Sequence, residues 1–274
     1  MERNMEKEVE ELKSLVRRRK VILFAGSGLS KCLGLPSWQE LMKNFGTDLG
    51  FHEDIFLMQG NFLELAEFFQ LEKKNLKLLC ERLSQEWHNE PSKILDSDIH
   101  KSIVELNFPS IFTTNYDNWL EIAHEKFGAK FHTIKTQGDL ASLSSGEPSV
   151  TTIFKYHGDL SAADEIVLTE TSYFKRLSLN SPMDIRLRSE ALSHAILFLG
   201  YSLSDINVRY LLYELHNIRM SFGGDKDHKT YIFLTTPNEI QERILRSRNI
   251  IPIYGRVRDP LRSTADFLKE LGEK

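Results

Sequence analysis

Glycine and serine residues follow the first apolar run of the chain, in the stretch VILFAGSGLSKCLGLPSW at residues 21–38. Gly26 and Gly28 permit close approach of a backbone to a ligand, and Ser27 and Ser30 supply hydroxyl groups for hydrogen bonds. A helix after this loop would present free N–H groups to an anion, so the stretch indicates a site for a phosphate-bearing ligand. It matches neither GxxxxGK[ST] nor GxGxxG, and a glycine turn of this kind is also compatible with a purely structural role.

Polar residues also gather in IFTTNYDNWLE, residues 111–121, where a second apolar run ends. Thr113 and Thr114 are followed by Asn115 and Asp117, and a helical pattern begins there. Asn and Asp commonly cap helix N-termini, but a cap needs only one such residue. The excess of polar side chains favours a turn that binds a ligand or takes part in catalysis.

A histidine leaves a third apolar run, in IFKYHGDL at residues 153–160. A single histidine is more often structural or solvated than catalytic. His157, however, stands at the end of an apolar run, and Gly158 leaves space beside it. Both features favour a functional role for the imidazole.

A second glycine–serine turn occurs in LFLGYSLSDINVRYLL, residues 197–212. Gly200 and Ser202 come directly after an apolar run, and Ser204 or Asp205 can cap the helix that follows. All four stretches stand where a strand is expected to end. In an open α/β sheet that edge is where ligands bind.

The elements that must position these residues alternate between β-rich runs and helical patterns. Strands are predicted at residues 21–25, 110–113, 152–156, 166–169, 195–199, 230–235 and 250–254. Helices are predicted for the amphipathic N-terminal segment and for residues 115–126, 183–194, 205–220 and 237–246. Several runs are apolar on both faces, as parallel strands between two helical layers are. The order predicts an α/β fold with a Rossmann-like, doubly wound and mostly parallel sheet.

One stretch interrupts this alternation. From about Trp38 to Asn107 the sequence has helical periodicity and no convincing strand. We expect a helical insertion or small helical lobe at residues 38–107, within a single domain that spans residues 1–274. Such a segment either gates the site or roofs it.

The composition narrows the classes of function. The chain has 274 residues, 41% hydrophobic and 27% charged, which is sufficient for a buried core. A net charge of −4 gives no general electrostatic reason to expect nucleic acid. The basic run at residues 17–20 permits a nucleic-acid patch, but basic residues also suit the C-terminus of a helix, and we favour that interpretation.

The cellular location follows from what the sequence lacks. The N-terminal segment is charged throughout, unlike a signal peptide, and no apolar run has the roughly 18 residues of a membrane span. The two cysteines, Cys32 and Cys80, form no disulfide framework and fit a reducing compartment. We therefore expect a cytoplasmic protein.

Taken in order, AGSGLS…LPSW, TTNYD, YHGDL and GYSLSDIN resemble the motifs of the sirtuin superfamily. The resemblance is greatest to the sirtuin-like domain of bacterial antiphage defence systems, and it extends from about Val21 to Gly255. It implies an enzyme that consumes NAD and acts as an effector by depleting it.

The resemblance also implies roles for individual residues. Asn115 and Asp117 match the pair that this family places near the nicotinamide ribose, and His157 matches its catalytic histidine. The turn at Gly200 matches the one that holds the adenosine half. The implied NAD-binding residues are Ala25, Gly26, Ser27, Gly28, Ser30, Pro36, Thr114, Gly200, Ser202, Asp205 and Asn207.

Two departures from the family pattern point away from protein deacylation. The chain contains no CxxC pair, so it lacks the zinc module of the deacylases, and no metal is expected. Pro36 is followed by Ser37 and Trp38 rather than by the arginine and phenylalanine of those enzymes. The expected reaction is therefore hydrolysis of the nicotinamide–ribose bond, which gives nicotinamide and ADP-ribose.

In this mechanism Asn115 fixes the ribose and can also orient an attacking water, and His157 is the general base on that water or on a ribose hydroxyl. Asp117 holds the carboxamide or stabilises the developing cation. A non-catalytic sensor of NAD or ADP-ribose is the main alternative, and a NAD-dependent ADP-ribosyltransferase or deacylase is less favoured.

The resemblance also suggests partners. Similar proteins form homo-oligomers or act with a separately encoded sensor, such as a HerA-type ATPase or a short Argonaute. No membrane contact and no direct binding of nucleic acid are expected.

Overall fold

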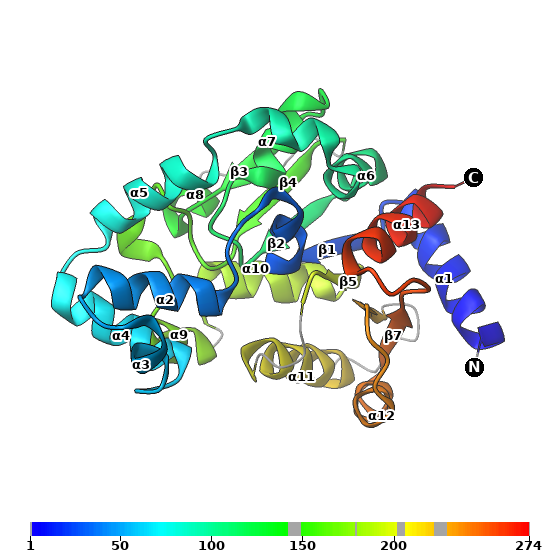
Figure 1. Cartoon of the computed structure of the whole chain (residues 1–274). Helices are drawn as coiled ribbons and strands as arrows, with labels where there is room; N and C mark the ends of the chain where they lie inside the picture. The colour runs from blue at the N-terminus through cyan, green and yellow to red at the C-terminus, as the bar shows by residue number, and fades with distance from the viewer. Residues whose placement is uncertain (1, 142–148, 179, 202–205, 222–228, 274) are drawn as a thin grey trace.

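A computed structural model describes residues 2–141, 149–178, 180–201, 206–221 and 229–273 (Figure 1). The described strands are β1 (Val21–Ala25), β2 (Ser110–Thr113), β3 (Phe131–Ile134), β4 (Thr151–Lys155), β5 (Ala195–Leu199), β6 (Thr230–Leu234) and β7 (Ile250–Tyr254). The α-helices are α1 (Glu2–Arg17), α2 (Trp38–Asp48), α3 (Glu53–Leu57), α4 (Phe62–Lys73), α5 (Lys77–Trp87), α6 (Asp98–Leu106), α7 (Trp119–Lys126), α8 (Gln137–Ala141), α9 (Glu170–Leu177), α10 (Pro182–Ala191), α11 (Ile206–Ser221), α12 (Glu239–Ser247) and α13 (Pro260–Gly272). Short 3₁₀ helices are η1 (Ser27–Leu33), η2 (Pro91–Asp96) and η3 (Ala163–Glu165).

The described strands form one parallel sheet in the order β3-β4-β2-β1-β5-β6-β7. Strand β1 lies between β2 and β5, with Phe24 opposite both Phe112 and Phe198. After β1 the chain builds the half of the sheet that contains β2, β3 and β4, and then returns to the other side of β1 as β5. This reversal creates a crevice at the carboxyl ends of β1 and β5, the usual ligand site in such sheets. The predicted doubly wound α/β fold is confirmed.

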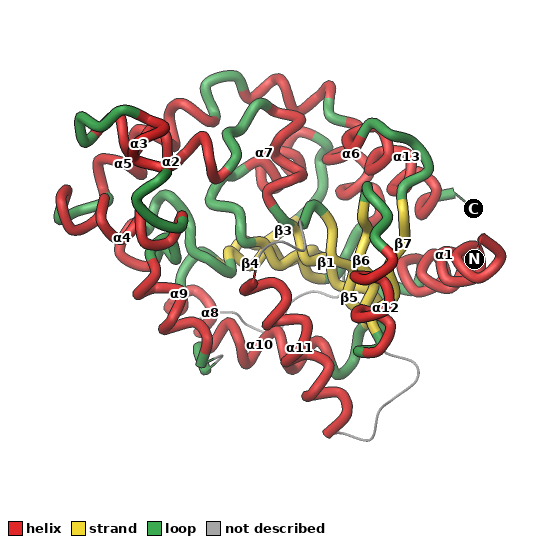
Figure 2. The backbone as a smooth tube through the Cα atoms, turned by 60° about the horizontal axis from the view of Figure 1, so that its bottom comes forward, coloured by secondary structure: helices red, strands yellow, loops and turns green. Residues whose placement is uncertain are grey.

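Helices cover both faces of the sheet (Figure 2). Alternate side chains of the central strands therefore enter two different cores. On one face Leu23 and Leu197 belong to a core with α1, α6 and α13. On the other face Phe24 and Phe198 belong to a core with α10, α11 and α12. The rings of Phe24 and Phe198 stack with their centroids 4.8 Å apart. Burial on both faces explains why the strand sequences are uniformly apolar.

The helices between β1 and β2 divide into two groups. Helices α2 to α5, here called the cap, have their own core around Met42 and Phe45. Tyr116 and Leu160, from the carboxyl edge of the sheet, join that core and so anchor the cap above this edge. Helix α6 instead packs on the sheet beside α13, with Ile103 completely buried. Within residues 38–107, therefore, only the cap stands off the sheet.

One strand prediction is wrong, and one strand of the sheet was not predicted. Residues 166–169 form no strand, because Ile166 and Leu168 are buried in the core of the cap rather than in the sheet. Thr169 caps α9 by accepting a hydrogen bond from Ser172 N. Strand β3 was not expected, since it is a short edge strand with an exposed His132 and only one fully buried residue, Ile134.

Smaller differences occur at element ends. Helix α7 begins at Trp119 rather than at Asn115, because Asp117 accepts a hydrogen bond from Trp119 N and the preceding residues form a turn. The helix expected after the first glycine loop is the 3₁₀ helix η1. The other predicted strands and helices are present with ends shifted by three residues or fewer.

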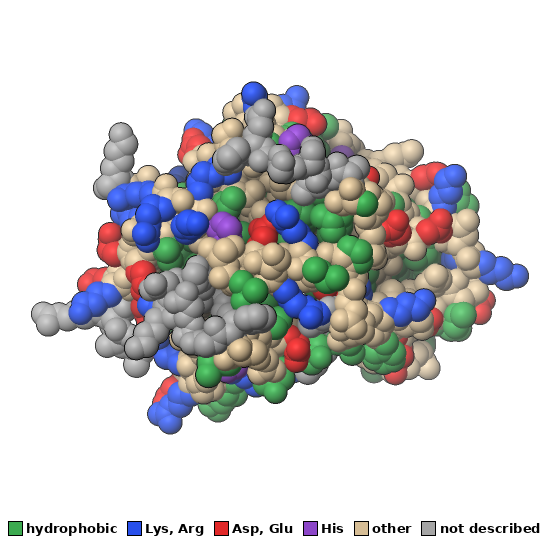
Figure 3. Space-filling view, turned by 180° about the vertical axis from the view of Figure 1, so that it is seen from behind, with side chains coloured by type: hydrophobic (Ala, Val, Ile, Leu, Met, Phe, Trp, Pro, Cys, Tyr) green, Lys and Arg blue, Asp and Glu red, His purple; other side chains and the backbone are tan. Residues whose placement is uncertain are grey.

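The basic run at the end of α1 is tied to backbone carbonyls. Arg19 donates a hydrogen bond of 2.8 Å to Asn107 O, and Arg17 donates one to Glu273 O. Lys and Arg side chains on the face seen in Figure 3 are interspersed with acidic and apolar ones. The hydrogen bonds of Arg17 and Arg19 agree with the interpretation that the basic run at residues 17–20 has a structural role at the end of α1. Within the described ranges, no helix has the length and apolar character needed to cross a membrane.

Candidate functional site

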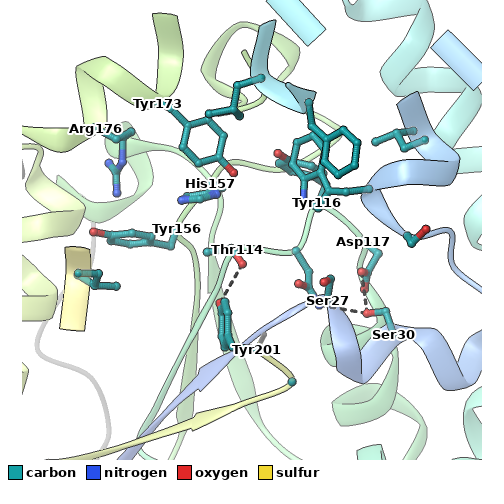
Figure 4. A pocket seen from close by; sticks show the side chains of 18 of the residues that line it. Ser27, Ser30, Thr114, Tyr116, Asp117, Tyr156, His157, Tyr173, Arg176 and Tyr201 are labelled. Atoms are coloured by element: carbon teal, nitrogen blue, oxygen red, sulfur yellow. Dashed lines mark hydrogen bonds between the residues drawn. The ribbon is translucent and has the colours of Figure 1, made fainter. Parts of the chain in front are cut away.

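A cavity of about 770 Å³ lies between the carboxyl ends of the central strands and the cap. It brings together residues from all four stretches singled out in the sequence: Pro36, Ser27 and Ser30, then Thr114, Asn115 and Asp117, then His157, then Gly200 (Figure 4). Trp38, Leu41 and Phe62 of the cap close the opposite side. Residues as far apart in the sequence as Ser27 and Gly200 therefore meet in one place.

Asn115 is held with its amide in a single orientation. Its Nδ2 donates to Gly26 O and to Ser30 Oγ, each at 3.1 Å. Ser30 Oγ in turn donates its hydrogen to Asp117 Oδ2 at 2.8 Å. Toward Asn115, therefore, Ser30 Oγ can only accept a hydrogen bond. If the Asn115 amide were flipped, its oxygen would face Gly26 O and Ser30 Oγ, which are both acceptors, so this orientation is unfavourable. Asn115 Oδ1 has no partner in the described part of the chain although it is buried, and it is therefore available to accept a hydrogen bond from a ligand.

Asp117 is buried and both of its carboxylate oxygens are engaged. Oδ2 accepts from Ser30 Oγ, and Oδ1 accepts from Trp119 N at 3.1 Å. The buried Lys155 donates a hydrogen bond to the backbone oxygen of Asp117. Asp117 thus fixes the turn and the neighbouring Ser30.

Lys155 belongs to a group of buried charges beneath this turn. Its Nζ lies 3.7 Å from Glu121 Oε1 and 3.8 Å from Asp159 Oδ2. Asp159 also pairs with Lys135 at 3.2 Å. Burial raises the pKa of Glu121, which Lys155 partly offsets. The cluster links the turn that carries Asn115 to the segment that carries His157.

His157 is nearly buried, with 9% of its surface exposed, and its imidazole lies between two aromatic rings. The ring of Tyr156 lies beside it, with centroids 5.6 Å apart and 24° between the planes, and Tyr173 meets it edge-on at 5.2 Å. Burial, with a smaller contribution from the Arg176 cation, lowers the pKa of His157 to about 3. The imidazole is therefore neutral near pH 7.

The glycines of the first and last stretches pack against each other. Gly28 N donates to Gly200 O at 2.9 Å, and a Cβ on Gly28 would lie 2.8 Å from that oxygen. A Cβ on Gly26 would lie 2.6 Å from it. Gly200 itself has φ of +76°, which favours glycine. The glycines are thus required where the backbone of the turn after β1 crosses that of the turn after β5, a contact here called the crossing. This requirement accounts for glycines at positions that do not match GxGxxG.

Thr114 and Ala25 contribute to the same crossing. Thr114 Oγ1 lies 2.8 Å from the Tyr201 hydroxyl, which donates to Ala25 O at 2.9 Å. Ala25, Gly26 and Gly28 do not line the cavity, whereas Thr114 does. Ser202 and Asp205 lie outside the described residues. Asn207 falls within α11, but its side chain is not among those described.

Residues that the sequence did not single out complete the cavity. Tyr173 and Arg176 come from α9, and Tyr156 and Tyr201 flank His157 and Gly200 in the sequence. Tyr156 and Tyr201 could have been found by their place beside the motif residues. Helix α9 carries no such signal, because the apolar residues before it predicted a strand. No cluster of three or more His, Cys, Asp or Glu side chains able to hold a metal is present in the described ranges.

The fold and the site define a doubly wound α/β protein with a cavity at its topological switch point, the class in which nucleotides bind between the carboxyl ends of strands. A model of the SIR2-like domain matches residues 109–253, which is more than half of the sequence. The chain belongs to the SIR2-like domain family.

The chain is also similar in sequence to individual curated proteins. The NAD(+) hydrolase ThsA of Acinetobacter baumannii is 29% identical over 213 residues, 77% of this chain and 42% of that protein. Its namesake from Bacillus cereus is 27% identical over 212 residues, with the same two shares. Defense-associated sirtuin 2 of Bacillus subtilis is 26% identical over 259 residues, 89% of this chain and 24% of that protein. The chain thus spans less than half the length of these curated relatives.

Proposed function

We propose that this protein hydrolyses NAD at the nicotinamide–ribose bond and releases nicotinamide and ADP-ribose. The observation that carries the proposal is that Asn115 and His157 line one cavity, with the buried amide oxygen of Asn115 free to accept a hydrogen bond. The names of the relatives from Acinetobacter baumannii and Bacillus cereus support the choice of reaction.

In the proposed step the C1′–N bond breaks, and its electron pair passes to the nicotinamide nitrogen, which was cationic and becomes neutral. A water oxygen forms the new bond to C1′. The oxygen of Asn115 accepts a hydrogen bond from this water or from a ribose hydroxyl. His157, neutral near pH 7, takes the proton that the water loses and later returns it to solvent.

We assign Asp117 a different role from the one expected from the resemblance. Since Ser30 and Trp119 N occupy both of its oxygens, we infer that it acts on Asn115 through Ser30 and does not hold the carboxamide. The absence of a CxxC pair favours water over a protein acyl group as the acceptor.

Chromatography of NAD incubated with the purified protein tests the proposal. The unaltered chain should release equal amounts of nicotinamide and ADP-ribose, and Asn115→Ala and His157→Ala should each lose about 10²-fold or more of this activity. His132→Ala, which alters an exposed histidine on β3, is the matched control and should retain it.

Three results would contradict parts of the proposal. NAD that stays intact in every condition, including with candidate partners added, excludes the enzyme. Stoichiometric NAD binding without nicotinamide release favours a sensor. NAD loss that survives both Asn115→Ala and His157→Ala overturns the assignment of roles.

We further propose that the protein is a cytoplasmic effector of antiviral defence that acts as a homo-oligomer or with a separately encoded sensor. The name of the Bacillus subtilis relative supports the defence context. Light scattering after size-exclusion chromatography tests self-association, and a monomer at micromolar concentration would contradict the homo-oligomer.

A further inference from the structure

Helix α9 forms one wall of the cavity and is held at both ends. At its start, Glu67 of α4 accepts hydrogen bonds from Thr171 N at 2.9 Å and from Thr171 Oγ1 at 3.1 Å. At its end, the Arg176 guanidinium donates to Ser181 Oγ at 2.6 Å and to Asp184 Oδ1 at 2.9 Å. The helix therefore connects the cap to the first turn of α10.

The Arg176 guanidinium also lies over the ring of Tyr156, 4.3 Å from its centroid. The hydroxyl of Tyr156 donates to Asp184 Oδ1 at 2.6 Å, the same oxygen that Arg176 binds. Arg176 therefore contacts the face of the Tyr156 ring, and Asp184, the ion-pair partner of Arg176, binds the Tyr156 hydroxyl. Such a fixed ring has little freedom to tilt.

The held ring is the one that flanks His157. Tyr173 of α9 contacts the imidazole from another side (Figure 4). The imidazole is thus positioned by Tyr173, which belongs to α9, and by Tyr156, which Arg176 of α9 holds in place. Arg176 is the charged group that acts on this imidazole. Glu170 of α9 and Asp117 of the turn after β2 also line the cavity, Asp184 of α10 pairs with Arg176, and Asp159 pairs with Lys135 and Lys155.

We propose that Arg176 is a positioning residue for the reaction, which holds Tyr156 against His157 and keeps a fixed cation beside the imidazole. The inference rests on the proposed function, because it assigns His157 the reacting role. Both terminal guanidinium nitrogens are bound, to Ser181 and Asp184, and only Nε has no partner among the described residues. We therefore infer that the side chain acts mainly through these protein groups, and the KM measurement below tests direct binding of substrate.

Arginine is required for both parts of this role. A planar guanidinium can stack on a ring while it donates to two separate oxygens, whereas a lysine ammonium is a point charge that cannot do both. A positive charge near the imidazole disfavours the imidazolium form, in agreement with the low pKa of His157.

The test compares Arg176→Lys and Arg176→Met with the matched control Arg186→Met. Arg186 lies on α10, binds Glu190 at 2.7 Å and stacks over Phe154 at 5.7 Å, but it does not line the cavity. This control thus removes an ion pair and a ring contact of the same kinds at a position outside the cavity lining. Steady-state kinetics with NAD are measured from pH 3 to pH 8, a range that includes the low pKa of His157.

For both variants of Arg176 we expect kcat to fall on the order of 10-fold to 100-fold, with KM changed less than about threefold. Arg176→Lys keeps the charge, so the acid limb of its pH–rate profile should stay in place. In Arg176→Met this limb should move to higher pH, because the cation is gone and the negative charge of Asp184 is no longer paired with it. Arg186→Met should leave kcat, KM and the limb unchanged.

A rise in KM with an unchanged kcat would overturn the inference, since it would mean that Arg176 binds substrate directly. An unchanged acid limb in Arg176→Met would overturn the electrostatic part.

A second measurement reads the same group without NAD. In protein labelled with ¹⁵N-histidine, the His157 ring signal, identified by its loss in His157→Ala, should keep its neutral form to lower pH in the unaltered chain than in Arg176→Met. Identical titrations would contradict the proposed effect of Arg176 even if the protein did not hydrolyse NAD.

Discussion

At the residue scale, the amide of Asn115 is oriented by the protein before any ligand arrives. Its donor side is bound to Gly26 O and Ser30 Oγ, and the direction of the Ser30 hydroxyl is determined by Asp117. Only the acceptor side is left for a ligand. A preoriented acceptor avoids part of the reorganisation cost at the moment of reaction.

Removal of the Ser30 hydroxyl tests this chain of hydrogen bonds. In Ser30→Ala, Asn115 loses one of two acceptors and Asp117 loses one of its two donors, so we expect kcat to fall about 10-fold to 100-fold, equivalent to roughly 1–3 kcal/mol. Ser30→Thr retains a hydroxyl and should recover part of the loss. The measurement is the initial rate of nicotinamide release, with urea unfolding to verify the fold.

The control for this series is Ser102→Ala, which removes a buried hydroxyl on α6 that does not line the cavity. Its kcat should equal that of the unaltered chain. A Ser30→Ala variant with full activity would show that Asn115 needs no such orientation.

At the element scale, the turns after β1 and β5 are joined backbone to backbone. Gly26 N donates to Leu199 O and Gly28 N donates to Gly200 O, so η1 lies directly on the turn that follows β5. Any side chain at these glycines would enter the space of the other turn. The crossing thereby fixes the position of Ser30 relative to the strand ends.

Gly28→Ala should separate these two turns. Gly28 does not have a positive φ, so the substitution adds no backbone strain and tests only the overlap of the new Cβ with Gly200 O. We expect a loss of roughly 1–3 kcal/mol in the free energy of unfolding, together with lower NAD hydrolysis. Chemical denaturation measures the first quantity.

Gly138→Ala is the matched substitution, because its Cβ would meet nothing closer than Thr136 Oγ1 at 3.6 Å. Its free energy of unfolding should change by less than about 1 kcal/mol. Equal stability of the two variants would contradict the close crossing.

At the scale of the whole molecule, burial of histidines couples stability to pH. Burial lowers the pKa of His100 to about 4 and that of His157 to about 3, and it also lowers the pKa of His124. In the unfolded chain these groups have pKa values near 6.5. Below that pH the unfolded state binds more protons than the folded state, so stability decreases as the pH falls.

We therefore expect the free energy of unfolding to drop between pH 7 and pH 5 by roughly 2 kcal/mol for each histidine that stays neutral in the folded state. His100→Gln should flatten this dependence, whereas His132→Gln, at an exposed position, should not. Urea unfolding at a series of pH values measures it. A dependence that is identical in all three proteins would contradict the assignment to His100.

Much of the architecture could be predicted because strand burial leaves a direct trace in sequence. Runs such as VILFA and AILFL are apolar at every position because both faces of the sheet are covered. Residues 166–169 have the same composition but are buried in the core of the cap, and composition does not distinguish the two environments. Strand β3 is missed for the opposite reason, since at the edge of the sheet it keeps polar residues.

The sequence by itself determined the parallel sheet, the order of its motifs and the residues that meet at its carboxyl edge, because local periodicity and strand ends are encoded along the chain. Only the tertiary structure decided which way the Asn115 amide faces and that α9 brings Arg176 and Tyr173 to His157. These relations join segments that are distant in sequence or depend on the direction of single hydrogen bonds. They are determined by packing, for which the linear sequence carries no local signal.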